Sequence, residues 1–497
     1  MWHDLFSIPK SADRPPAVLF PGKQERQDED VVHYATVTPE VIARLQELVG
    51  HDHVLLDDEQ RTVYGKDETE DLSFPPEVIV RPHTAGEVSA ILLLASRASV
   101  PVTPRGGGTG LSGGALAVHG GICLSMERFN HILEIDEVNL QAVVEPGVTT
   151  QQFQEEVESH GLFYPPDPAS RGSCHLGGNL AECAGGPRAV KYGVTKDYVL
   201  GVEAVLPSGE VIQTGAGVLK NVTGYNLTQL LIGSEGSLAV ITKIVFRLIP
   251  LPKLRTVLLI AFPSLEEAAE TVASIFRAGI TPSALEFMER AAVQVAEQRL
   301  GKKFPNGEAE AQLFLEIDGN YEEALRGDIE VIAGVVEQHH ALDILLAEGR
   351  AKMEEVWSLR RGLGEAVKSI SAYKEEDTVV PRGQLPHLVR GVKEICSRHG
   401  VTSICYGHAG DGNVHVNILK DRLDDAAWDR LADTAVREIF ELTVSLGGTI
   451  SGEHGIGYTQ KSYLPIALSP TEIRLMKEIK HAFDPAGILN PGKIFPD

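Results

Sequence analysis

The sequence feature that most constrains the fold is a run of six glycines among the nine residues 106–114. Residues 100–103 before the run and 121–126 after it have the composition of strands. Residues 108–113 match G-x-G-x-x-G, but a Rossmann loop opens a helix, whereas this run leads into a strand. Consecutive glycines can instead turn backbone N–H groups inward and bind an anion. The run therefore favours phosphate binding over a plain glycine-rich turn.

Two further clusters of small residues, 177–186 and 233–238, lie downstream. Small residues at several separated places let the backbone approach a ligand closely. Three such clusters in one chain predict a single large, flat ligand.

Length, charge and cysteine content exclude several classes of protein. A chain of 497 residues is too long for one core, so two or three domains are expected. The 69 acidic and 45 basic residues give a net charge of −24 without a basic block, which argues against binding nucleic acid or an anionic membrane surface. No apolar stretch is long enough to span a membrane, and the N-terminus lacks the architecture of a signal peptide.

The five cysteines are scattered and form no C-x-x-C pair, which argues against an iron–sulfur cluster in this chain. Free cysteines fit a reducing compartment. We therefore expect a cytoplasmic protein, and peripheral attachment to the inner face of the membrane stays open.

The pattern of elements predicts an α+β protein. A Thr38-Pro39-Glu40 start predicts a helix from 39, and apolar spacing predicts another over 84–96. After Pro252 strands and helices alternate, which predicts a separate α+β domain whose helices cover one face of a sheet. A last helix is expected over 471–490. Residues 1–36, rich in proline and charge, are interpreted as a poorly ordered extension.

Two short runs near the C-terminus carry metal-binding residue types. Residues 401–406 and 413–419 have the pattern of strands, and the turn between them brings His408 beside His415. Two histidines with one carboxylate, Glu453, are typical of a catalytic metal site with open positions. Zinc is favoured, with manganese or iron as alternatives. Histidines that only hydrogen-bond within a turn are the competing interpretation.

Seven motifs in this order resemble a known family. They are the Arg-Gly-Gly-Gly-Thr-Gly loop, Gly177-Gly178-Asn179 with Ala184-Gly185-Gly186, Thr223-Gly224-Tyr225-Asn226-Leu227, Gly233-Ser234-Glu235-Gly236, the run from Gly407 to His415, Gly452-Glu453-His454-Gly455, and Asn490-Pro491-Gly492-Lys493. Over about residues 37–497 the chain resembles the FAD-linked D-2-hydroxyacid dehydrogenases of the vanillyl-alcohol-oxidase-type flavoprotein superfamily. That family includes D-lactate dehydrogenases, the flavin subunit of glycolate oxidase and D-2-hydroxyglutarate dehydrogenase.

The resemblance implies a two-subdomain FAD-binding domain over 37–252 and a cap domain over 253–455 that carries the substrate and metal sites. Residues 456–497 would return to the FAD domain. It also implies a set of cofactor-binding residues: Pro104, Arg105, Gly106, Gly107, Gly108, Thr109, Gly110, Ser112, Gly113, Pro166, Asp167, Gly178, Asn179, Gly185, Gly186, Val240, Ile241 and Asn490. Since the phosphate loop has neither histidine nor cysteine, we expect non-covalent FAD.

The chemistry expected of such a site concerns the hydroxyl of a 2-hydroxy acid. A metal held by His408, His415 and Glu453 would lower the pKa of that hydroxyl. His454 would accept the proton as general base, and the hydride would pass to flavin N5. Arg360 stands where the family carries a partner for the substrate carboxylate, with Arg361 as the adjacent alternative. A solvated helix face is the other interpretation of either arginine.

The expected substrate is a small D-2-hydroxy monocarboxylate, with D-lactate ahead of glycolate. The 2-hydroxyglutarate branch has polar groups where this chain has Gly364 and Glu375, and Glu375 would repel a second carboxylate. Lys374, one position earlier, would restore a cation if the alignment shifted by one residue. A D-2-hydroxyglutarate dehydrogenase, an alcohol or sugar oxidase that uses O₂, and a flavin-binding scaffold subunit remain as alternatives.

The sequence does not identify the electron acceptor, for which a quinone, a cytochrome, an electron-transferring flavoprotein and an iron–sulfur subunit are candidates. It also leaves open whether the chain forms a homodimer.

Overall fold

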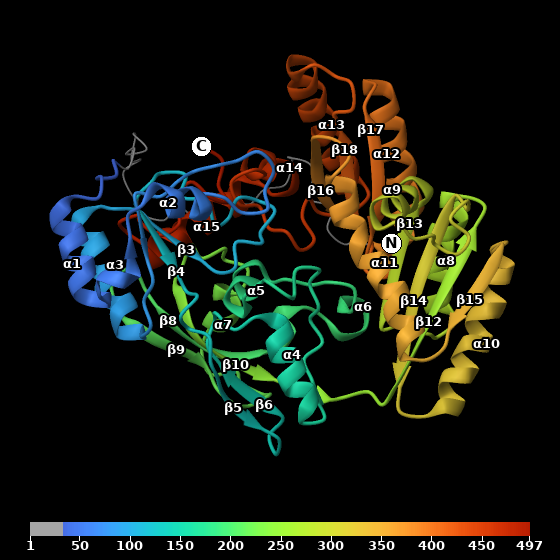
Figure 1. Ribbon diagram of the computed structural model, residues 1–497, viewed down its shortest axis with the longest axis horizontal. Helices are drawn as coiled ribbons and strands as arrows, with labels where there is room; N and C mark the ends of the chain where they lie inside the picture. Colours follow the sequence, from blue (N-terminus) through green and yellow to red (C-terminus); the bar gives the residue numbers. More distant parts are fainter. Residues whose placement is uncertain (1–32) are drawn as a thin grey trace, which may run out of the picture. The chain divides into compact units, whose positions relative to one another are not determined.

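The computed structural model describes residues 33–497, of which Tyr34 to Asp497 form one compact unit (Figure 1). Most of the predicted extension, residues 1–32, lies outside the described residues. Tyr34 donates its hydroxyl to the carbonyl of Gly487 at 2.9 Å, and the Ala35 N–H donates to Ser99. These residues are therefore tied to the body.

The first sheet of the unit has the strand order β1-β2-β4-β3. Strands β3 and β4 run parallel, and no helix lies in residues 106–121 between them, as the glycine run predicts. The helix starts are also confirmed, because Thr38 and Thr84 accept the N–H groups of Val41 and Glu87. The elements are α1 (Pro39–Val49), η1 (His51–His53), β1 (Val54–Leu55), α2 (Asp58–Tyr64), β2 (Val78–Val80), α3 (Ala85–Ala98), β3 (Val102–Arg105) and β4 (Ile122–Ser125).

A second, antiparallel sheet has the order β5-β6-β10-β8-β9, and β7 pairs with β11 beside it. Its buried face packs against α4 and α5 around Phe153, Leu180 and Phe246. The elements are β5 (Ile132–Asp136), β6 (Gln141–Val144), α4 (Thr150–Ser159), β7 (Leu162–Phe163), α5 (Leu176–Glu182), α6 (Ala189–Tyr192), η2 (Thr195–Asp197), β8 (Val199–Val205), β9 (Val211–Gly215), α7 (Leu227–Leu231), β10 (Val240–Arg247) and β11 (Ile249–Pro250).

The third sheet is antiparallel throughout and has the order β15-β12-β14-β13-β17-β18-β16. Its strands and helices follow the predicted alternation. They are β12 (Leu254–Phe262), α8 (Leu265–Arg277), β13 (Ala284–Glu289), α9 (Arg290–Leu300), β14 (Ala311–Gly319), α10 (Glu322–Gln338), β15 (Asp343–Ala347), α11 (Arg350–Lys368), β16 (Tyr373–Val379), η3 (Arg382–Gln384), α12 (Leu385–His399), β17 (Thr402–Gly407), β18 (Asn413–Leu419) and α13 (Asp425–Ser445).

The prediction that helices cover one face of this sheet is wrong. Helices α8, α10, α12 and α13 pack on one face, and α9 and α11 pack on the other, around Phe314 and Trp357 (Figure 1). The reason is that β12 is apolar on both sides, since Leu258 and Ile260 face one layer and Val257 and Leu259 the other. The face that carries α9 and α11 also carries the polar site residues.

The C-terminal segment packs against the first two sheets: Ile488 and Leu489 join the core of the first, and Ile479 and Phe483 that of the second. It contains η4 (Lys461–Tyr463), α14 (Leu464–Ala467) and α15 (Pro470–Phe483). The last helix ends at Phe483 and is shorter than expected. It ends there because Pro485 disfavours helical geometry at the preceding residue, Asp484. The described residues include no helix with the length and apolarity needed to cross a membrane.

Candidate active site

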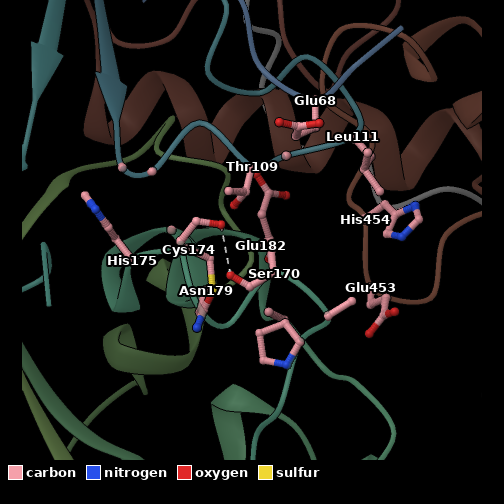
Figure 2. Close-up of a pocket in the computed structure, with 18 of the residues that line it drawn as sticks. Glu68, Thr109, Leu111, Ser170, Cys174, His175, Asn179, Glu182, Glu453 and His454 are labelled. Carbon is pink, nitrogen blue, oxygen red and sulfur yellow. Dashed lines mark hydrogen bonds between the residues drawn. The ribbon is translucent and has the colours of Figure 1, made fainter. Parts of the chain in front are cut away.

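A cavity of about 660 Å³ lies between the glycine loop after β3 and the seven-stranded sheet. Figure 2 shows His175, Cys174 and Asn179 on one side of it, and Glu453 and His454 on the other. Most of the predicted site residues line this cavity: Pro104, Arg105, Gly106, Gly107, Gly108, Thr109, Gly110, Asp167, Gly178, Asn179, Val240, Ile241, Arg360, His408, His415, Glu453 and His454. The structure thus brings together residues that are up to 350 positions apart in the sequence (454 minus 104).

Six predicted cofactor residues are not part of the lining: Ser112, Gly113, Pro166, Gly185, Gly186 and Asn490. Two of them, Asn490 and Gly185, support the wall from behind. The side-chain amide of Asn490 donates to the carbonyls of Gly114 at 3.0 Å and Glu235 at 2.7 Å. A Cβ atom on Gly185 would lie 3.0 Å from Oε2 of Glu453, so this glycine leaves room for a predicted metal ligand.

The glycines of the cavity wall leave space that the protein itself does not fill. At Gly110 and Gly178 no protein atom lies within 4 Å of the place that a Cβ atom would take. Gly178 has ordinary helical geometry in α5, so neither its backbone nor its packing requires glycine. The open space in front of these residues fits a large ligand that approaches the backbone, as FAD would.

Cys174 and His175 come close to the same space from another segment. Cys174 lies 3.2 Å from the hydroxyl of Thr150, and burial raises the pKa of its thiol. It is therefore held as a neutral thiol. The expectation of non-covalent FAD stays a prediction.

The three predicted metal ligands converge at one corner of the cavity. Nε2 of His408 lies 3.1 Å from Oε1 of Glu453, and Nε2 of His415 lies 3.6 Å from the same oxygen. Their ligand atoms all lie within 4.8 Å of one another, which fits a divalent cation held by two imidazoles and a carboxylate. The turn 408–412 joins β17 to β18, and thereby places His408 next to His415 as the strand pattern predicts.

His415 also belongs to a second group with similar spacing, formed with Glu375 and His454. The register of β16 with β18 explains why these side chains meet. Glu375 is paired with Asn417 and Asp377 with His415, so all four side chains lie on the same face of the sheet. One imidazole ring thus serves both groups.

Glu286, which the sequence analysis did not single out, fixes the orientation of His408. It is 0% exposed, and both its oxygens accept a hydrogen bond from Nδ1 of His408 at 2.9 Å. Burial alone would lower the pKa of His408, but Glu286 and Glu453 outweigh burial and raise that pKa well above its ordinary value. With Nδ1 engaged, Nε2 is the atom that faces the other ligands. The one signal in the sequence is a glutamate at position 286 between the apolar residues of β13.

Asp377, two positions after Glu375 on β16, organises the segment 451–454. Its Oδ2 accepts the N–H groups of Gly452, Glu453 and His454 at 2.8, 2.7 and 2.8 Å. Burial would raise the pKa of Asp377, yet the neighbouring rings of His454 and His415 lower it. A buried, charged Asp377 therefore directs both Glu453 and His454 towards the cavity.

His454 stacks on His415 with the ring centres 5.1 Å apart and the planes 14° from parallel. Burial would lower the pKa of His454, but Asp377, Glu375 and Glu453 outweigh it and raise this pKa. Burial and the neighbouring His454 lower the pKa of His415. Of the two stacked rings, His454 is therefore the stronger base, and the lowered pKa of His415 favours the neutral form that a metal ligand requires.

Arg360 lies in the cavity wall but is not solvated, because only 7% of its surface is exposed. Its guanidinium forms an ion pair with Glu286 and lies over the ring of Tyr406 at 5.4 Å. Arg361 also lines the cavity and pairs with Glu354 at 2.9 Å. The buried position excludes a solvated helix face for Arg360.

Two consecutive regions of the chain match protein families. Residues 76–215 match the FAD binding domain, and residues 251–494 match the C-terminal domain of FAD linked oxidases.

Individual relatives are similar over almost the whole chain. The glycolate oxidase subunit GlcD of Bacillus subtilis is 39% identical, covering 92% of this chain and 97% of its own. The D-lactate dehydrogenase of Anaerostipes hadrus is 37% identical, covering 93% and 98%. The D-2-hydroxyglutarate dehydrogenase of Stutzerimonas stutzeri is 35% identical, covering 92% and 99%.

Among solved structures, p-cresol methylhydroxylase with substrate bound superposes with a TM-score of 0.77 at 19% identity, covering 92% of this chain and 96% of its own. The 4-ethylphenol oxidase of Gulosibacter chungangensis gives 0.74 at 20% identity, covering 92% and 97%. At this identity the likeness concerns the fold alone, which is that of the vanillyl-alcohol-oxidase-type flavoproteins.

Proposed function

This chain belongs to the family of FAD-linked oxidases, and from that premise we propose that it is an FAD- and metal-dependent dehydrogenase of a small D-2-hydroxy acid. The observation that carries the proposal is the position of His408, His415, Glu453 and His454. They line the same cavity as the glycine loop.

The cavity fits FAD by its shape and its lining. Residues 106–110 would hold the pyrophosphate through backbone N–H groups, and Gly178 and Asn179 would lie against the flavin end. When bound, FAD accepts a hydride equivalent from the carbon that bears the substrate hydroxyl.

The corner formed by His408, His415 and Glu453 fits a divalent cation by its donor set, with zinc favoured over manganese or iron. A cation there lowers the pKa of a hydroxyl placed beside it. Glu286 keeps Nε2 of His408 directed at that position, and Asp377 does the same for the carboxylate of Glu453 through the backbone of residues 452–454.

His454 is the residue that we assign as general base. Its ring faces the cavity beside the metal ligands, and the carboxylates of Asp377, Glu375 and Glu453 stabilise the imidazolium that forms when it accepts a proton. Arg360 has an Nε atom that is buried and finds no hydrogen-bond partner in residues 33–497, so it can donate to a substrate carboxylate.

A monocarboxylate substrate is favoured by the polarity of β16. Glu375 lines the cavity, and its Oε2 is buried without a hydrogen-bond partner among the described residues. A second substrate carboxylate near this oxygen would be repelled. Lys374 does not offset this repulsion, because it is paired with Ile418 on the opposite face of the sheet. Monocarboxylates are therefore proposed ahead of D-2-hydroxyglutarate, and D-lactate is the monocarboxylate that we propose first.

The proposal is tested by the substrate preference of protein loaded with FAD and zinc or manganese. D-Lactate, glycolate, D-2-hydroxybutyrate, malate and D-2-hydroxyglutarate are compared by kcat/KM with an artificial dye as electron acceptor, and with O₂ in its place. We expect the highest kcat/KM for D-lactate and slow turnover with O₂. A preference for D-2-hydroxyglutarate or malate would overturn the substrate assignment, and faster turnover with O₂ than with the dye would make the protein an oxidase.

A further inference from the structure

Five arginine and lysine side chains line the cavity, and four of them are already engaged by protein groups. Arg171 and Arg361 pair with Asp167 and Glu354, Arg360 pairs with Glu286, and Arg105 donates to the backbone carbonyls of Tyr64 and Lys66. The fifth is Lys368. Among the described residues, its ammonium group has no hydrogen-bond or ion-pair partner.

Lys368 lies on the same face of α11 as Arg360. The two residues are eight positions apart with Gly364 midway, and side chains at this spacing project from one side of a helix. All three positions line the cavity. A Cβ atom on Gly364 would lie 3.4 Å from the Tyr406 hydroxyl, so this turn of the helix faces Tyr406.

The ring centre of Tyr406 lies 5.5 Å from that of His415, on which His454 stacks. The part of α11 that carries Gly364 and Lys368 therefore lies near the histidines of the site. Glu70 is also close, but burial and Glu375 raise the pKa of Glu70 to about 8. Glu70 is therefore mostly neutral near pH 7 and does not cancel the charge of Lys368.

The charge balance distinguishes Lys368 from Arg360. Glu286 is fully buried and lies against the guanidinium, so its carboxylate offsets charge on Arg360, whereas no described carboxylate pairs with Lys368. A carboxylate that leaves water needs a net opposite charge nearby as well as hydrogen bonds.

On the basis of the function proposed above, we propose that Lys368 binds the substrate carboxylate together with Arg360, with its ammonium group as counter-ion. Arg360 adds a hydrogen bond from its unpartnered Nε. A small 2-hydroxy acid has its carboxylate on the carbon that bears the hydroxyl, which matches two cations that line the same cavity as His454.

The test uses FAD-loaded, metal-loaded Lys368→Met, Lys368→Arg and a control, Lys352→Met. Lys352 lies on the same helix, pairs with Glu355 and does not line the cavity. Loss of a charge-assisted hydrogen bond predicts a rise of about 10- to 100-fold in KM for D-lactate in Lys368→Met, with a smaller change in kcat. Lys368→Arg should recover most of the loss, and Lys352→Met should match the wild type.

Two further readouts separate binding of a carboxylate from a structural effect. The Kd of pyruvate, measured by the change in flavin absorbance, should rise by the same factor in Lys368→Met, whereas kcat/KM for the methyl ester of D-lactate should not change. FAD affinity and thermal stability should equal those of the wild type. Unchanged KM and Kd in Lys368→Met, or a loss of FAD affinity instead, would overturn the inference. If the wild type oxidises none of the 2-hydroxy acids, the proposed function itself fails.

Discussion

At the scale of a single residue, Glu286 connects the predicted metal ligand His408 to Arg360. It accepts from Nδ1 of His408 and pairs with Arg360, so its removal would free a predicted metal ligand and leave a buried guanidinium unpaired. Glu289, on the same strand, is also buried but pairs with Lys393 outside the cavity.

We therefore expect Glu286→Gln to weaken metal binding by about 10- to 100-fold, the usual loss when a partner of a metal-bound histidine is replaced. Glu289→Gln, the same substitution on the same strand, should leave metal binding unchanged. Titration of the FAD-loaded, metal-free proteins with zinc measures both affinities. Equal affinity of wild type and Glu286→Gln would show that Glu286 does not orient His408.

Glu376 is a second buried carboxylate on β16, on the face opposite to the cavity. Burial raises its pKa to about 8 from an ordinary value of 4.5. Because the folded protein holds this proton more tightly than the unfolded chain, the contribution to stability is complete below pH 4.5 and is lost as the pH rises through about 8.

The amide in Glu376→Gln does not titrate, so this variant does not lose stability as the pH rises. The difference between its melting temperature and that of the wild type should therefore shift in favour of the variant between pH 5 and pH 9. Glu330→Gln, at an exposed position of α10, should show no pH-dependent difference. Thermal unfolding of the three proteins across this pH range measures the effect. A pH-independent difference for Glu376→Gln would mean that Glu376 is ionised in the folded protein.

At the scale of an element, α5 is a short helix that carries two glycines against the cavity. Gly178 has free space where a Cβ atom would lie, so alanine there meets no protein atom. Alanine within a helix is more favourable than glycine by roughly 0.5–1 kcal/mol. The same methyl group would project into the space assigned to FAD.

Gly178→Ala should therefore leave the apoprotein at least as stable as the wild type and weaken FAD binding. An overpacking cost of about 1–3 kcal/mol corresponds to roughly 10- to 100-fold in Kd. Gly334→Ala in α10, also with no atom within 4 Å of the Cβ position, is the control that should not change FAD binding. Flavin titration and thermal unfolding of the apoproteins are the measurements. An unchanged Kd in Gly178→Ala would place the flavin elsewhere.

At the scale of the whole molecule, the groups proposed for FAD and for the metal come from different sheets. Residues 104–110 follow a strand of the first sheet, whereas His408 and His415 lie at strands of the third. The two ligands are thus expected to bind independently.

Removal of the metal by a chelator should abolish reduction of the flavin by D-lactate while the flavin stays bound, and zinc or manganese should restore the reaction. Absorbance of the flavin after desalting measures retention, and its bleaching by substrate measures activity. Acid precipitation should then release the flavin into the supernatant. Flavin reduction by the metal-free protein would contradict the metal role, and flavin in the acid precipitate would contradict non-covalent binding.

Local patterns in the sequence were sufficient for several elements and for the proximity of His408 and His415. The capping residues Thr38 and Thr84 start helices as predicted, and the glycine run lies between two strands without a helix. His408 and His415 lie within one strand pair, so their proximity follows from the turn between them. These features depend on neighbours along the chain, and that is why the sequence alone determines them.

Contacts between distant segments could only be decided by the tertiary structure. Glu286 reaches His408 across 122 positions, and Asp377 binds the backbone of His454 across 77 positions. The face on which Lys374 lies depends on the register of β16 with β18, and the lack of a protein partner for Lys368 depends on the packing of α11. Neither residue differs locally from a lysine on a solvated surface, because the charges and the space that surround a side chain are supplied by segments far away in the sequence.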